Sequence, residues 1–364
     1  MSKLPGVCTT AAAALLVFSL CAAPVHAERR VPTLAVTMTN DPVSNQIQVY
    51  DAKTGVLLQT LSTKGKGGVG GNANGVKAYR GEFFAAVNNG SGTVALYRRA
   101  AAGLTFDRLV QTSSAPVSID FGNDHMYVAG ATTIDSFEMS RHSAVWKDGT
   151  ADLALAEGGA PPNGSTAQVG VVDERTLLVT LKSDPTPGTV DVVRLHDGAV
   201  TGAAPTAVSA PSGTLTPFGF SVYPDGTAVI TLAHSNQEGL FRNGAFVSVI
   251  DAGQLAPCWT TRAGKYVFSA NTASKTISRL VGTGNHVFVD SAVGATIANG
   301  ASPTDMDNDA GVLGVIDHAA GQSHLSLYAY NTFGELAAIR GPINLGTGNA
   351  NGIAIMAATE DDAD

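Results

Sequence analysis

A pair of short alternating strands joined by a tight turn recurs along this chain and limits what it can fold into. The clearest copy lies at 257–280, which reads PCWTTRAGKYVFSANTASKTISRL. In it, the runs Tyr266–Ala270 and Thr276–Leu280 flank a turn at Asn271–Lys275. β-Branched and aromatic residues at period two, bounded by Gly, Asn and Ser, are typical of an antiparallel meander.

Six other copies bring the number of paired-strand units to seven. They are Leu34–Met38 with Gln46–Tyr50, Glu82–Val87 with Thr93–Tyr97, His125–Ala129 with Thr133–Met139, Thr176–Leu181 with Thr189–Leu195, Ala228–Leu232 with Ala245–Ile250, and Gly311–Ile316 with His324–Tyr330. A leading strand precedes six of the pairs, at Gly75–Tyr79, Pro116–Phe121, Gln168–Val172, Phe218–Tyr223, Pro257–Thr261 and Thr304–Met306. The leading strands recur every 40 to 50 residues or so, roughly the blade period of a β-propeller. We therefore predict an all-β, seven-bladed β-propeller.

The two ends of the chain carry a signal for closing the ring. The first pair, which begins at Leu34, has no leading strand before it. The tetrapeptide Asn-Ala-Asn-Gly opens a leading strand at Asn72 and occurs again at Asn349. We expect Ile353–Met356 to pair antiparallel with Leu34–Met38, so that both chain ends contribute to one blade.

The N-terminus has the pattern of an export signal. Lys3 is its one charged residue, an apolar run follows at Ala11–Ala23, and small residues precede a cleavage site after Ala27. The run is shorter than the ~20 residues that a membrane span needs, so we expect a cleaved Sec-type signal and no membrane insertion. The prediction is a periplasmic or secreted protein with one propeller domain at 28–359 and an acidic tail at 360–364.

Charge and cysteine content narrow the classes of partner. Loss of the leader changes the formal net charge from −8 to −9, which argues against nucleic acid or an anionic membrane as the main partner. Cys258 is the one cysteine that remains, so the chain forms no internal disulfide. A chain of this length can be stable through its core alone, and we expect a monomer. The 41 glycines and the 14% of charged residues suit a protein with many tight turns.

Two blades resemble those of a known family. The segments NNGSGTVALYRR (88–99) and GKYVFSANTASKTISRL (264–280) are similar to the Tyr-Val-x-Asn and Ser-x-Thr-Val-x-x-Tyr units of the lactonase family of seven-bladed propellers. That family includes 6-phosphogluconolactonases and carboxymuconate cyclases, and the resemblance implies a ring-shaped cleft. Its enzymes are expected to use His, Arg and Glu there, with Pro-Arg-His opening a leading strand. The matching position here reads Pro257-Cys258-Trp259, so no catalytic residue is carried over.

Propeller geometry selects candidate site residues on its own. A leading strand starts on one face of the ring, and the turn between the second and third strands of a blade returns to that face. The residues at these places include three candidates for acid–base work on a lactone, which are His234, His318 and Lys182. They also include candidate binding residues, which are Asn72, Asn88, Asn271, Asp305, Asp317, Asn349 and Trp259.

Each candidate also has a structural interpretation. Asn residues cap turns and tolerate left-handed backbone, and His234 and His318 lie in turns where a solvated imidazole is common. Cys258 beside Trp259 fits a small buried residue next to a packed ring. No cofactor is predicted, although Asn and Asp oxygens such as those of Asp305 could hold a divalent cation.

Two functions follow from these residues. The first is an exported propeller that binds a small polar ligand or a protein segment on one face of the channel. The second is a lactone hydrolase or cycloisomerase that uses His234, His318 or Lys182. The sequence has no HExxH, GxSxG, P-loop or CxxC motif, and it lacks the family's His and Arg, which favours the first function. Two convergent titratable groups in one pocket would favour the second.

Overall fold

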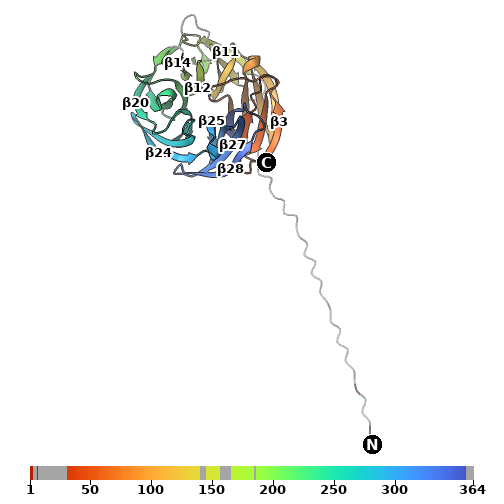
Figure 1. The fold of residues 1–364 in the computed structure, drawn as a ribbon. Helices are drawn as coiled ribbons and strands as arrows, with labels where there is room; N and C mark the ends of the chain where they lie inside the picture. Colours follow the sequence, from red (N-terminus) through yellow and green to blue (C-terminus); the bar gives the residue numbers. More distant parts are fainter. Residues whose placement is uncertain (3–5, 7–30, 140–144, 156–164, 184–185, 358–364) are drawn as a thin grey trace. The chain divides into compact units, whose positions relative to one another are not determined.

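The computed structural model describes residues 1–2, 6, 31–139, 145–155, 165–183 and 186–357. Contacts within the chain separate Met1–Arg30 from a compact unit that begins at Val31. In this unit seven antiparallel sheets stand around a ring, with β12 and β25 near its centre and β3, β20, β24 and β28 at its periphery (Figure 1). The predicted all-β, seven-bladed propeller is confirmed. The predicted cleavage site after Ala27 and the tail at 360–364 lie outside the described residues.

The blades are named here A to G, and their strands are given from the channel outward. Blade A contains β29 (Asn351–Met356), β1 (Leu34–Met38), β2 (Gln46–Asp51) and β3 (Leu57–Ser62). Blade B contains β4 (Val76–Tyr79), β5 (Phe83–Asn88), β6 (Thr93–Ala100) and β7 (Gly103–Gln111). Blade C contains β8 (Pro116–Gly122), β9 (His125–Gly130), β10 (Thr133–Met139) and β11 (Val145–Asp152). Blade D contains β12 (Thr166–Asp173), β13 (Thr176–Leu181) and β14 (Thr189–His196), with β15 (Ala199–Val200) and β16 (Thr206–Ser209) both on β14.

The remaining blades have four strands each. Blade E contains β17 (Pro217–Val222), β18 (Ala228–Leu232), β19 (Gln237–Arg242) and β20 (Ala245–Asp251). Blade F contains β21 (Pro257–Ala263), β22 (Tyr266–Asn271), β23 (Thr276–Thr283) and β24 (His286–Thr296). Blade G contains β25 (Ser302–Asp309), β26 (Val312–Ala319), β27 (Gln322–Tyr330) and β28 (Leu336–Asn344). Short 3-10 turns occur at η1 (Asn89–Ser91), η2 (Ala233–Ser235) and η3 (Ala298–Gly300). Among the described residues no helix is long and apolar enough to cross a membrane.

The ring closes between its two chain ends, as the sequence predicts. Strand β1 pairs antiparallel with β29, with Leu34 opposite Met356 and Val36 opposite Ala354. The two Asn-Ala-Asn-Gly copies meet at the channel, where Asn351 Nδ2 donates to Asn72 Oδ1 over 3.0 Å. The repeated motif therefore marks two neighbouring inner strands, β29 and β4, that contact each other across the seam between blades A and B.

One predicted strand pairing is wrong. The sequence pattern joins Ala228–Leu232 directly to Ala245–Ile250, but the structure inserts β19 between them. β19 reads QEGLFR, which has no β-branched residue and a glycine at its centre, so it lacks the usual strand signal. Its neighbour β20 reads AFVSVID and alternates clearly, so the sequence pattern predicts β20 as the partner of β18.

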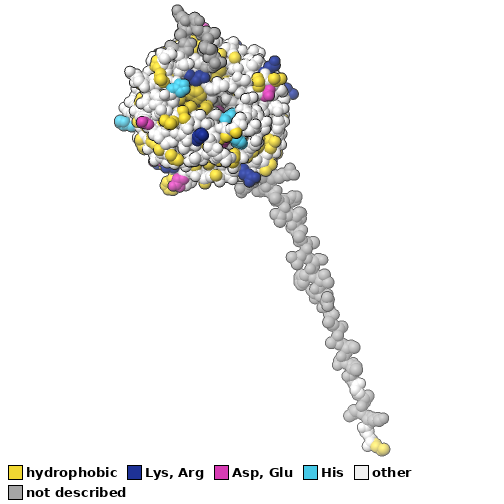
Figure 2. Space-filling model, viewed as in Figure 1, with side chains coloured by type: hydrophobic (Ala, Val, Ile, Leu, Met, Phe, Trp, Pro, Cys, Tyr) yellow, Lys and Arg dark blue, Asp and Glu magenta, His cyan; other side chains and the backbone are white. Residues whose placement is uncertain are grey.

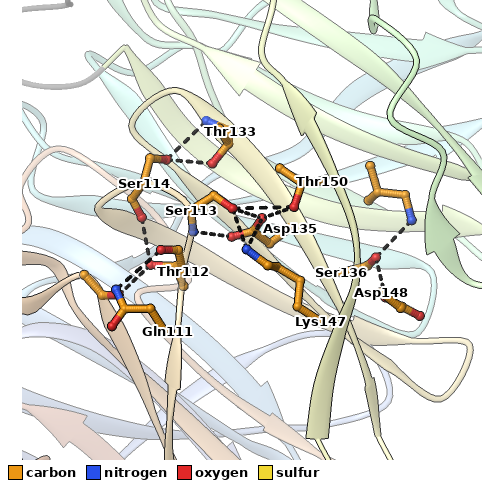
Figure 3. A network of polar contacts seen from close by, with 12 residues as sticks. Gln111, Thr112, Ser113, Ser114, Thr133, Asp135, Ser136, Lys147, Asp148 and Thr150 are labelled. Atoms are coloured by element: carbon orange, nitrogen blue, oxygen red, sulfur yellow. Dashed lines mark hydrogen bonds and ion pairs between the residues drawn. The ribbon is translucent and has the colours of Figure 1, made fainter.

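Polar side chains fasten neighbouring blades where no sheet hydrogen bonds exist. Between blades B and C, the buried carboxylate of Asp135 accepts hydrogen bonds from the Ser113 N–H and Oγ (2.7 Å each) and from Thr150 Oγ1 (2.6 Å). Figure 3 shows this network, in which Lys147 also approaches the carboxylate at 3.9 Å. Ser113 belongs to the connection from β7 to β8, so Asp135 fixes the path by which the chain leaves one blade for the next.

At the seam between blades E and F, a buried carboxyl group stands where five other blades bury an aliphatic side chain and blade G buries Ser323. The second residue of the third strand is fully buried in blades A, B, C, D and F, where it is Ile47, Val94, Ile134, Val190 and Ile277. In blade E this position is Glu238, which is 0% exposed. Its Oε1 accepts a 2.6 Å hydrogen bond from Ser269 Oγ on β22. Burial raises the pKa of Glu238 to about 8, against a smaller lowering by the Ser269 hydrogen bond, so the carboxyl is protonated at neutral pH.

The closing pair leads to a prediction about stability. Ile353 and Ile355 are 1% and 2% exposed, and burial of each is worth roughly 1.5–3 kcal/mol. A domain is stable by only about 5–15 kcal/mol, and the loss of β29 would also expose the edge of β1. Deletion of residues 348–364 should therefore give insoluble or strongly destabilised protein, measured by urea unfolding. Deletion of 360–364 is the control and should change nothing; a cooperative transition in the longer deletion would contradict this account of closure.

Glu238 leads to a second prediction. In the unfolded chain its carboxyl ionises near the ordinary value of 4.5, whereas in the folded protein it keeps its proton up to about pH 8. Between these values the folded state binds the extra proton, so a rising pH lowers the free energy of unfolding by up to about 1.4 kcal/mol per pH unit. Glu238→Gln keeps an acceptor for Ser269 and does not ionise. Its stability relative to the wild type should rise between about pH 5 and pH 8 and then level off; a pH-independent difference would refute the raised pKa.

Candidate functional site

The front of the channel, defined as the end at which the inner strands begin, is crossed by a glycine-rich segment. This strap, residues 64–74, connects the outer strand of blade A to the inner strand of blade B. Trp259 Nε1 of blade F donates to the Asn72 carbonyl over 2.8 Å, and Asn72 Nδ2 donates to the Val117 carbonyl of blade C over 2.7 Å. The Ala73 N–H donates to the Ala167 carbonyl of blade D over 3.0 Å. The strap is therefore anchored on opposite sides of the channel, and Asn72 takes part in two of these three hydrogen bonds.

The strap needs glycine where it passes close to other backbone. A Cβ at Gly67 would lie 2.4 Å from the carbonyl carbon of Asn40, which is rigid backbone. A Cβ at Gly75, just after the strap, would lie 2.8 Å from Asn351 Oδ1 and 2.9 Å from Asn72 Nδ2. A side chain at Gly67 would therefore force the strap to move, and one at Gly75 would disturb the hydrogen bond between Asn72 and Asn351.

Two pockets flank the strap, and both touch Gly68, Val69 and Gly71. The Trp259 pocket has a volume of about 380 Å³ and is lined also by Asn40, Pro42, Trp259, Thr304, His318, Asn349, Ala350 and Asn351. The Lys182 pocket has a volume of about 590 Å³ and is lined also by Gly70, Asn89, Ala115, Val117, Ala131, Thr166 and Lys182. Figure 2 shows one face of the protein hollowed at its centre, with apolar side chains inside the hollow and basic and histidine side chains beside it.

His318 has no free ring nitrogen. Its Nε2 lies 3.2 Å from the Ala350 carbonyl, which can only accept, so Nε2 carries the proton. Its Nδ1 lies 3.2 Å from Ser323 Oγ and accepts from that hydroxyl in the neutral ring. Burial lowers the pKa of His318, with smaller opposing effects from the Ala350 carbonyl and the Asp317 charge. A neutral ring with both nitrogens occupied is poorly placed to take a proton from a substrate or from water.

Lys182 follows the end of β13 and points its amine at the strap. Its Nζ donates to the Gly71 carbonyl over 2.5 Å and lies 5.9 Å from the centre of the Phe218 ring. Burial lowers the pKa of Lys182 to about 8, so most of the amine is protonated at neutral pH. No other charged residue of the described chain lines this pocket.

His234 lies apart from both pockets. It is exposed in η2, and its Nδ1 lies 2.9 Å from Thr216 Oγ1. The three candidate catalytic residues therefore do not converge: Lys182 and His318 lie in different pockets beside the strap, and His234 lines neither.

The candidate binding residues fall into two groups. Trp259 and Asn349 line the Trp259 pocket, and Asn72 anchors the strap. The other four, Asn88, Asn271, Asp305 and Asp317, are at most 1% exposed and line neither front pocket. Their side chains bond within or between blades; for example, Asn88 Nδ2 donates to the Thr63 carbonyl over 3.1 Å, and Asn271 Nδ2 donates to Ser278 Oγ over 2.7 Å.

A third cavity contains charged residues that the sequence analysis did not select. It lies in the channel toward the back, where the inner strands end, and has a volume of about 270 Å³. Its charged lining residues are Lys77, Asp120, Arg262 and Asp307. Each comes from the inner strand of a different blade, where it follows apolar or small residues. Their strands also contain other polar residues, as in β25 (SPTDMDND) and β21 (PCWTTRA), so no local pattern in the sequence distinguishes them. Among the described residues no group of three or more His, Cys, Asp or Glu has the geometry to hold a metal ion.

Solved structures resemble this chain in fold. The periplasmic gluconolactonase of Pseudomonas aeruginosa matches with a TM-score of 0.62 and 14% identity, over 90% of this chain and 100% of that one. A Bacteroides fragilis protein provisionally described as a 6-phosphogluconolactonase matches with a TM-score of 0.61 and 12% identity, over 89% and 98%. The fold is that of a lactonase-like propeller. Virginiamycin B lyase from Staphylococcus aureus also matches, with a TM-score of 0.53 and 13% identity, over 79% and 93%.

These likenesses bear on fold alone, since the same propeller architecture serves a lyase as well as lactonases. No protein-family profile matches the sequence, and no curated protein matches it either.

The anchoring of the strap leads to a third prediction. Trp259 is 8% exposed, and Trp259→Phe keeps the aromatic packing but leaves the Asn72 carbonyl without its donor. An unsatisfied buried acceptor costs about 1–3 kcal/mol, which urea unfolding should detect. Trp146→Phe is the matched control, because Trp146 is 46% exposed on β11. If the two substitutions lower the free energy of unfolding equally, the hydrogen bond from Trp259 to the strap does not contribute measurably to stability.

Proposed function

We propose that the protein binds a small polar anion, such as a sugar acid, in the Lys182 pocket, and that it does so as a binding protein. The observation that carries this proposal is the single ammonium group in a cavity of about 590 Å³ that contains no balancing carboxylate. A carboxylate or phosphate is the natural complement of such a group. Asn89 and Thr166 line the same pocket and could hydrogen-bond the ligand's hydroxyl groups.

The arrangement of titratable groups supports binding over hydrolysis. Opening a lactone needs a base for water and an acid for the leaving oxygen within reach of one substrate. The Lys182 pocket offers one titratable side chain, and the Trp259 pocket offers His318, whose ring nitrogens both have partners. Lactone hydrolysis stays as the second candidate because the fold is shared with proteins named as gluconolactonases.

An exported location fits this function. The signal-like sequence pattern up to Ala27 supports it, and a periplasmic protein is among those with the same fold. A periplasmic or secreted binding propeller would meet sugar acids outside the cytoplasm. Its partners are then a small ligand or a protein segment on the front face, with the chain itself acting as a monomer.

The proposal predicts how D-gluconate binds in isothermal titration calorimetry. Removal of the charge by Lys182→Met should weaken binding about 10- to 100-fold, the range for a hydrogen bond to a charged group. Wild-type affinity should fall as the pH rises through about 8, because the free amine loses the proton that attracts the anion. Lys275→Met is the control, since Lys275 is an exposed lysine of the β22–β23 turn outside the pocket.

The same samples test the second candidate. If the wild type hydrolyses δ-gluconolactone above the spontaneous rate, and if His234→Ala and His318→Ala each lower that rate by ~100-fold or more, the protein is an enzyme and the binding proposal fails. Gluconate binding that is unchanged in Lys182→Met would overturn the assignment of the site.

A further inference from the structure

The back cavity is separate from both front pockets. Inner strands of blades B to G line it, through Lys77, Asp120, Gly170, Ser221, Thr260 and Asp307 among others. None of its lining residues belongs to the strap except Asn74 at the strap's end, and it shares no residue with the Trp259 or Lys182 pocket. Its volume of about 270 Å³ equals that of roughly nine water molecules in the liquid.

The charges that line this cavity balance. Lys77 Nζ lies 3.6 Å from Asp307 Oδ1, and their side chains are 24% and 13% exposed. Burial lowers the pKa of Lys77, but the attraction of Asp307, Asp120 and Asp305 outweighs it, so the net direction is upward and the amine stays charged. Arg262 supplies a second positive charge, and Asp120 and Asp307 supply two carboxylates. This contrasts with the Lys182 pocket, where the positive charge stands alone.

Several polar atoms of the lining have bonding capacity to spare. Arg262 Nε and Nη1 donate to the carbonyls of Val222 (2.9 Å) and Gly264 (2.8 Å), while its Nη2 has no hydrogen-bond partner among the described residues. Asp120 Oδ2 accepts from the Val171 N–H over 2.8 Å, and the same side chain lines the cavity. Thr260, only 8% exposed, accepts from Ser221 Oγ over 3.0 Å, and its own hydroxyl proton meets no acceptor in the described chain.

We propose that this cavity binds a small neutral polyol, a molecule with several adjacent hydroxyl groups. A hydroxyl group both donates and accepts, so adjacent hydroxyls can bridge a carboxylate and a neighbouring cation such as Asp120 and Lys77. A simple anion would meet two carboxylates, and a simple cation would meet an ammonium and a guanidinium. Ser221, Thr260 and Thr261 also line the cavity and add neutral hydroxyl groups to these charges.

The test is calorimetric titration of the full chain with myo-inositol. Saturable binding is expected, and Arg262→Gln should weaken it about 10- to 100-fold through loss of one charged donor. Arg175→Gln is the matched control, because Arg175 is exposed and lies outside the cavity. Thr260→Val provides a second variant that keeps the side chain's shape and removes only the hydroxyl group, and it should also weaken binding.

The outcomes separate this site from the front one. Lys182→Met and saturating D-gluconate should leave myo-inositol binding unchanged, so either proposal can fail while the other stands. Absence of binding up to about 10 mM myo-inositol would overturn the inference. Binding that both Arg262→Gln and Thr260→Val leave intact, or tighter binding of the zwitterion glycine than of myo-inositol, would overturn it as well.

Discussion

The hydrogen bonds between β1 and β29 hold the two ends of the chain in one sheet, and every other blade depends on them for its position. In a ring of sheets each blade has neighbours on both sides, so an open joint would leave two unpacked faces as well as one unpaired strand edge. The buried side chains of β29, such as Ile353 and Met356, pack into the cores on either side of this joint. Closure therefore secures the packing of both flanking blades together.

Around the channel, the inner strands of neighbouring blades are too far apart to form a continuous sheet, and carboxylates bridge them. Asp120 Oδ2 accepts the Val171 N–H of the next blade, and Asp307 Oδ2 accepts the Ile355 N–H over 2.9 Å. Burial raises the pKa of both carboxyls, and Lys77 lowers it in opposition. The same acids that join the blades thus line the back cavity, so structure and binding chemistry are coupled there.

Most of the fold could be predicted from the sequence because blade strands alternate strongly and glycine, asparagine and serine mark their turns. Ring closure was predictable because Asn-Ala-Asn-Gly occurs twice, and the structure places the two copies in contact. Strand β19 was missed because QEGLFR carries no strand pattern; what makes it a strand is its place between β18 and β20.

The site was less accessible to sequence reasoning. Propeller geometry predicts that Asn72 lies on one face of the ring, at the mouth of the channel. In the structure the strap holds Asn72 in the channel itself. This position depends on hydrogen bonds to residues as distant in sequence as Trp259 and Asn351. Lys77 and Arg262 stand in inner strands without a local motif, and only the ring brings them together. Similarly, the partners that occupy the His318 ring come from other parts of blades G and A, so its availability as a base could not be judged from its turn.

The strap also has a mechanical consequence. Neighbouring sheets in a ring can slide slightly at each seam, and such sliding would widen or narrow the channel. A segment that is hydrogen-bonded on opposite sides of the channel resists these changes in channel diameter. Asn72 and Ala73 connect the junction of blades A and B to blades C, D and F through these hydrogen bonds. The front pockets and the back cavity share no lining residue, so a ligand in a front pocket and a ligand in the back cavity would contact different residues.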